Sequence, residues 1–179
     1  MDDASAGRSE LLEHGPAGPH RRWSRRRWLA VAAAVVLLAV AVAADRWVHA
    51  GEVRSARANL AAAEQAADHA DGLLQSTFQY SSPLIVSTRA SDSVRSALRA
   101  LVMQAAADGA AELRAVRTSV AGTSLLPWHT DIRRSRKATL AFLDAKIAFL
   151  AAGSRDYNQL NEAPPGVASA LDQARVLSP

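Results

Sequence analysis

An uninterrupted run of aliphatic residues near the N-terminus constrains this chain more than any other feature. All 16 residues from Leu29 to Ala44 are Leu, Val or Ala, and Trp28 and Trp47 bracket the run. The 18 residues between the two tryptophans would span roughly 27 Å as a helix, close to the bilayer hydrocarbon thickness of about 30 Å. Indole rings at both ends are typical of the headgroup region. The run therefore predicts a membrane-spanning helix.

Arginines flank this run unequally. The 15 residues before Leu29 carry five arginines, and the 15 residues from Asp45 to Asn59 carry three. Because basic residues are enriched on the cytoplasmic side of a span, we expect a cytoplasmic N-terminus and an extracytoplasmic C-terminal part. The lipid bilayer is then the first expected partner. The candidate anchor and interface residues are Arg25, Arg26, Arg27, Trp28, Leu37 and Trp47.

Three other interpretations of the run stay open at this point. Ala41-Val42-Ala43 has the small-x-small form that a signal peptidase accepts, so the run could be a cleaved secretory signal. The segment 24–30, Ser-Arg-Arg-Arg-Trp-Leu-Ala, resembles the twin-arginine export signal. That resemblance covers seven residues and implies export of a folded protein. The last interpretation is a buried helix in the core of a soluble domain.

Composition predicts that the rest of the chain is all-α. Of the 179 residues 40 are Ala, and 19 of the 21 basic residues are Arg; both favour helices, and their abundance is typical of a bacterium with a GC-rich genome. No segment shows the two-residue alternation of a strand. We expect residues 1–22 to form a disordered cytoplasmic tail, 23–47 the basic flank and anchor, and 48–179 an extracytoplasmic helical bundle.

Four helices are predicted downstream of the anchor, over residues 52–80, 92–121, 131–152 and 166–177. The first has a thin coiled-coil-like stripe of mostly Ala and Leu, and Pro83 is expected to end it. Ser91 or Asp92 would cap the second helix, and Thr130 or Asp131 the third. The apolar stripe of the second helix is expected to include Leu101, and that of the third to include Leu143 and Leu150. The similar lengths of the first two helices and their short connection favour an antiparallel three- or four-helix up-down bundle.

The two ends of such a bundle have different candidate surfaces. The connection 122–130 would lie next to the membrane. Its apolar side chains would insert into the outer leaflet, cover a transmembrane partner or close the bottom of the bundle core. The basic residues that follow would meet anionic headgroups or pair with acidic side chains. The connection 81–90 would lie at the far end and carry a partner-binding patch or cap the core. The membrane-proximal candidates are Leu125, Leu126, Trp128, Arg133 and Arg134, and the partner-patch candidates are Leu84, Ile85 and Val86.

The sequence contains no specific motif for catalysis, metal binding or phosphate binding. The chain has no Cys, no His-Glu-x-x-His motif and no phosphate-binding glycine loop. Glu64, Asp68 and Asp71 share one helix face with His69 beside them, which would suit a cation only if another helix added ligands; pairing with basic residues of neighbouring helices is the simpler expectation. The net charge of +4 is divided between the basic flank and the bundle, and aromatic residues are scarce, so nucleic-acid binding is not expected.

The sequence therefore predicts a non-catalytic, single-pass accessory or scaffold protein that has no cofactor or metal. Its bundle would bind another envelope or membrane protein, and self-association is left open. The alternative is an exported helical protein, released by cleavage of a secretory or twin-arginine signal, that binds a ligand or cofactor.

Overall fold

The computed structural model describes residues 25–87, 89–162 and 164–179, with side chains from Trp28 onward. Over these residues the chain is all-α, as predicted, and the described part contains no strand. The helices are α1 (Arg25–Val86), α2 (Asp92–Gly122), α3 (Thr130–Gly153) and α4 (Val167–Val176), with a short 3₁₀ helix, η1 (Tyr157–Asn161), before α4. The predicted tail, residues 1–22, lies outside the described residues.

The chain divides into two compact units, residues 1–44 and 45–179. The described part of the first unit is the beginning of α1, which contains the aliphatic run. This helix is long and apolar enough to cross a membrane. None of its most apolar 18-residue window is buried within the described structure. The second unit contains the remainder of α1 and all the other helices.

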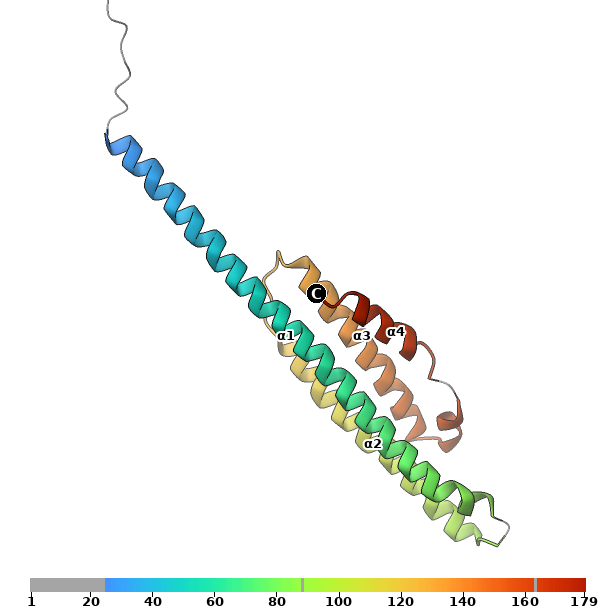
Figure 1. Ribbon diagram of the computed structural model, residues 1–179. Helices are drawn as coiled ribbons and strands as arrows, with labels where there is room; N and C mark the ends of the chain where they lie inside the picture. The colour runs from blue at the N-terminus through green and yellow to red at the C-terminus, as the bar shows by residue number, and fades with distance from the viewer. Residues whose placement is uncertain (1–24, 88, 163) are drawn as a thin grey trace, which may run out of the picture. The chain divides into compact units, whose positions relative to one another are not determined.

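Contacts within residues 45–179 define an up-down bundle (Figure 1). Asn59 of α1 bonds Thr123 beyond the end of α2, and His69 lies against Glu112, so the two helices are antiparallel. Thr123 also accepts a bond from Arg136 of α3, which makes α2 and α3 antiparallel. The remaining helix α4 runs along α3 and antiparallel to α1, as the predicted topology required.

Small side chains let α1 and α2 approach closely. The fully buried positions along α1 include Ala63 and Ala70, and those on α2 include Ala106 and Ala110. At the closest point, a Cβ added to Gly109 would lie 2.9 Å from the Ala70 Cβ. Glycine is therefore required at this contact, since no larger residue leaves room for the facing alanine.

Larger apolar side chains come mainly from α3 and cover the α1–α2 pair. Phe142, Leu143 and Leu150 are almost fully buried and join one cluster with residues of α1 and α2. The end of α3 packs tightly against η1, since a Cβ on Gly153 would overlap the Leu160 side chain. This arrangement confirms the predicted stripe on α3, in which Leu143 and Leu150 were central.

The predicted limits of the first helix are wrong at both ends. The helix α1 starts within the basic flank instead of at residue 52. No proline stands between the aliphatic run and the Ala-rich stripe, and the single Gly51 costs only about 1 kcal/mol of helix propensity. It also continues through Pro83 to Val86. Proline removes one backbone donor, but only three residues follow it, so the loss is confined to the last turn. In that turn the Ser81 hydroxyl donates to the Thr77 carbonyl at 2.6 Å.

The buried face of α2 also differs from the prediction in its first half. Val102 and Ala106 are buried there, whereas Leu101, which was expected in the core, is half-exposed. Close packing against the alanines of α1 selects the smaller residues of α2 for the inner face. Ser91 caps α2 as predicted, since its hydroxyl accepts a bond from the Val94 N–H at 3.4 Å.

We predict that the same glycine-to-alanine change has opposite effects at two helical positions. Gly109→Ala should lower the free energy of unfolding by about 1–3 kcal/mol, because its Cβ overpacks the contact with Ala70. Gly72→Ala, which meets no atom within 4 Å, should raise it by about 0.5–1 kcal/mol through helix propensity. Denaturant unfolding of the full chain in mild detergent, followed by circular dichroism, measures both. Equal effects would contradict the close approach of α1 and α2.

Candidate functional site

The connection between α2 and α3, residues 123–129, is bonded to the part of α1 that directly follows the aliphatic run. The Glu52 carboxylate accepts a bond from the Leu126 backbone N–H at 2.9 Å and contacts His129 Nδ1 at 2.5 Å. The side chains of Glu52 and His129 are largely buried, at 11% and 7% exposed. One buried carboxylate of α1 therefore holds both the backbone and a side chain of the connection.

Two further α1 residues extend this polar cluster. The Trp128 indole Nε1 donates to Asp45 at 2.9 Å, and Asp45 also lies 3.4 Å from His129 Nε2. His49 lies 3.7 Å from Asp131 of α3, and its ring packs edge-on against that of His129 at 4.6 Å. The cluster thus joins α1, the α2–α3 connection and the start of α3.

The pKa of His129 is raised above its ordinary value of 6.5. The hydrogen bond to Glu52 is the largest cause, and the negative charges of Glu52 and Asp45 add to it, whereas burial acts in the opposite direction. The imidazolium form is therefore stabilised by the fold. His129 also occupies the N-cap position of α3 without making a side-chain cap bond, because its ring is turned toward Glu52. The expected caps, Thr130 and Asp131, are wrong for this reason.

The sequence did not single out this cluster, although a signal for it exists. Asp45, His49 and Glu52 are spaced at i, i+4 and i+7, so they share one helix face. That spacing predicts a polar face but does not show which distant residue lies against it. The partner, His129, is 77 residues from Glu52, and only the antiparallel return of α2 brings the two together.

The predicted membrane-proximal turn lies in this same connection. Trp128 is 62% exposed, whereas Leu125 and Leu126 are half-buried. The two leucines line a cavity of about 450 Å³ together with Trp47 and Val48 of α1. The connection therefore presents one exposed indole and one apolar cavity at the end of the bundle where Asp45 lies.

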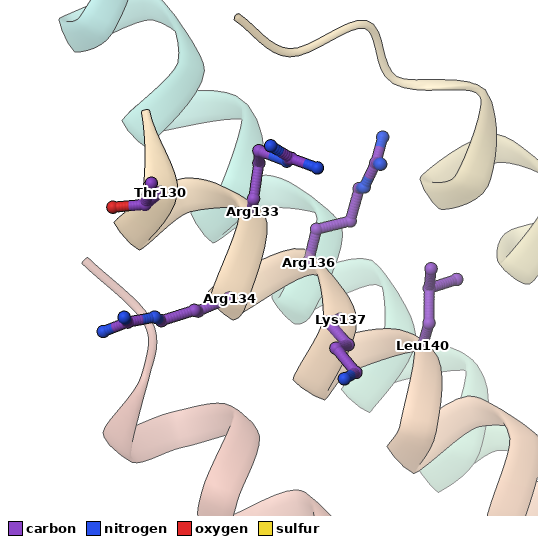
Figure 2. A pocket seen from close by; sticks show the side chains of 6 residues that line it. All are labelled: Thr130, Arg133, Arg134, Arg136, Lys137 and Leu140. Atoms are coloured by element: carbon purple, nitrogen blue, oxygen red, sulfur yellow. The ribbon is translucent and has the colours of Figure 1, made fainter. Parts of the chain in front are cut away.

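A basic groove lies on the first turns of α3, next to the polar cluster. Its volume is about 470 Å³, and Figure 2 shows its basic side chains projecting from successive turns of the helix. Arg133 donates to the Pro127 carbonyl at 3.1 Å, and Arg136 donates to the Thr123 carbonyl at 2.6 Å. The groove is lined by Thr130, Arg133, Arg134, Arg136, Lys137 and Leu140.

The opposite end of the bundle, the distal tip, consists of the last turns of α1 and the first turns of α2 (Figure 1). The three predicted patch residues are not equivalent there. Leu84 and Val86 are 44% and 76% exposed, but Ile85 is 8% exposed and belongs to the packed side. Tyr80 is 71% exposed on the same helix. The exposed apolar surface of the tip therefore consists of Tyr80, Leu84 and Val86, with Val94 of α2.

The acidic face of α1 pairs with other helices. Asp71 accepts bonds from the buried Lys146 of α3 at 2.5 and 2.7 Å, and Glu64 accepts one from Arg175 of α4 at 2.6 Å. His69 contacts Glu112 of α2 at 2.9 Å. Within the described residues, no group of three or more His or acidic side chains is arranged to hold a metal ion.

Comparisons with protein-family models, curated proteins and solved structures gave no match. The function must therefore be inferred from the residues of this chain.

We predict that the stability of the bundle depends on pH through His129. Because its folded pKa is raised above 6.5, the imidazolium stabilises the fold fully below the unfolded pKa, and this contribution is lost as the pH rises through the folded pKa. The melting temperature should therefore fall as the pH rises above the ordinary histidine pKa of 6.5 and through the raised pKa of His129. His129→Gln should reduce this fall. The control is His69→Gln, which removes an exposed imidazole and should leave the fall in melting temperature unchanged. If His129→Gln showed the same pH dependence as the wild type, the prediction would be contradicted.

Proposed function

We propose that this chain is a single-pass membrane protein whose α1 holds the bundle on the extracytoplasmic side, where the bundle binds another envelope or membrane protein without catalysing a reaction. The observation that carries the proposal is the exposed aliphatic run at the start of α1, followed in the chain by a packed helical bundle. The unequal arginine flanks support an N-terminus in the cytoplasm.

The distal tip supports a binding role. Between Asp71 and Arg89 the chain has no charged residue, and the tip exposes large apolar side chains, including Tyr80 and Val86. Such a surface is suited to burial against another protein. Arginines of the nearby turns, Arg89, Arg95 and Arg99, would favour a partner surface that is apolar with acidic residues at its margin.

A non-catalytic role is supported by the way the ionisable side chains are used. The largely buried Glu52, His129 and Lys146 each contact an oppositely ionising group on another segment of the bundle. They join helices α1 and α3 and the α2–α3 connection. This is the arrangement expected of groups that fix the packing of a bundle.

Leu37→Glu should abolish stable membrane integration. A charge at the bilayer centre costs about 2.5–3.5 kcal/mol even on translocon-based scales, and Leu37 lies in the middle of the aliphatic run. The measurement is the fraction of protein retained in membranes after alkaline carbonate extraction. Leu37→Ala, which keeps the run apolar, is the matched control and should stay in the membrane, and equal retention of both variants would contradict the anchor.

The intact mass of the membrane-associated protein separates an anchor from a cleaved signal. An anchored chain keeps its N-terminal segment and its flanking arginines. A mature form that begins near Ala44 in the soluble envelope fraction would support the exported alternative and refute the anchor.

Substitutions at the distal tip should weaken partner binding without unfolding the bundle. We expect Leu84→Ser with Val86→Ser to change the free energy of unfolding by only about 0.5 kcal/mol, because both side chains are exposed. Val176→Ser with Leu177→Ser, which removes exposed apolar side chains from α4, is the control. The measurement is crosslinking to membrane proteins in intact cells, followed by mass spectrometry. Crosslinks that are unchanged in the tip variant would contradict this binding surface.

A further inference from the structure

We propose that the basic groove on α3 binds the phosphate-bearing headgroup of an anionic membrane lipid. The inference rests on the proposed function in one respect, namely that the aliphatic run of α1 lies in a membrane. It adds to that function a second attachment, made by the bundle itself at the lipid surface.

The cations of the groove are not neutralised within the protein. Arg133, Arg134, Arg136 and Lys137 are four basic residues within five positions, and none forms an ion pair in the part of the chain that the structure describes. Elsewhere in the described bundle Arg95, Arg117, Lys146 and Arg175 are paired with carboxylates, and the basic residues that are not paired are scattered rather than clustered. The neighbouring acid, Asp131, lies 3.7 Å from His49. An uncompensated basic cluster of this kind attracts anions.

Two of the four cations are held in place by the α2–α3 connection. The Arg133 and Arg136 guanidinium groups donate to the carbonyls of Pro127 and Thr123, which fixes their side chains without neutralising their charge. Such positioning lowers the entropy lost when an anion binds. Among the described residues, Arg134 and Lys137 make no side-chain hydrogen bond, and both side chains project from α3 (Figure 2), so their donors remain available to a ligand.

The position of the groove favours a lipid over a soluble anion. Glu52 and Asp45 bind the connection that immediately precedes α3, and Asp45 is the residue that follows the aliphatic run. The groove therefore lies at the end of the bundle where α1 would emerge from the bilayer. Exposed Trp128 lies at the same end, and indole rings favour the headgroup region. Leu140 adds an apolar side chain to the groove lining.

The test uses the full chain in micelles of an uncharged detergent. Dihexanoyl-phosphatidylglycerol, dihexanoyl-phosphatidylcholine and inorganic phosphate are titrated separately, and binding is measured by native mass spectrometry. We expect the anionic lipid to bind more tightly than the zwitterionic one. Since each basic residue near an anionic surface is worth about fivefold in affinity, Arg134→Gln with Lys137→Gln should weaken phosphatidylglycerol binding about 25-fold.

The matched control is Arg114→Gln with Arg155→Gln, which removes the same charge from exposed positions outside the groove. It should change the affinity less than twofold. Equal weakening by the two double variants would overturn the proposal, and so would equal affinity for the two lipids. Inorganic phosphate that binds as tightly as phosphatidylglycerol would assign the groove to a soluble anion. The measurement does not depend on membrane insertion, so its failure is distinguishable from loss of anchoring in the carbonate experiment.

Discussion

The close approach of α1 and α2 is the constraint on which the bundle depends. Alanines of both helices and one glycine bring the two backbones together. Each alanine removes little apolar area from water, so this interface gains more from dispersion contacts between backbones than from hydrophobic burial. The pair therefore needs α3, because Phe142, Leu143 and Leu150 supply much of its buried apolar area.

This dependence on α3 makes the two ends of the bundle unlike each other. At the Asp45 end, Glu52 fixes the α2–α3 connection against α1, and His129 and Trp128 add further bonds to the same helix. At the distal tip, the last turns of α1 pack against α2, Phe78 stacks on Tyr157 of η1, and large apolar side chains are exposed. The first end is therefore held by several polar contacts between α1 and the α2–α3 connection. The second end is suited to burial by another protein, because it leaves apolar area uncovered.

Much of the architecture could be predicted from the sequence, because it depends on local patterns of residues. The spacing of the alanines predicted the buried face of α1, and Ser91 was an expected cap of α2. Similar helix lengths and short connections indicated the up-down order of the helices. The choice between Leu101 and Val102 on α2 could not be made locally. It depends on how closely the alanines of α1 approach, which is a property of the assembled pair.

The candidate sites were less predictable, since their character depends on which groups pair across helices. The basic residues of α3 were visible in the sequence, but an isolated helix does not reveal whether acidic residues of other helices neutralise them. Ile85 shows the same limit. Its neighbours Leu84 and Val86 are exposed while it is buried, and helical rotation divides these three adjacent residues between two faces.

The direction of α4 has a practical consequence for labelling. Because α4 runs antiparallel to α1, it brings Pro179 back to Arg57, whose Nε donates to the Pro179 carbonyl oxygen at 2.5 Å. A fluorophore joined to Pro179 would therefore report on the half of the bundle that contains Asp45. A small label in the α1–α2 connection would lie at the opposite end of the bundle. The distance between the two labels would then measure the length of the bundle.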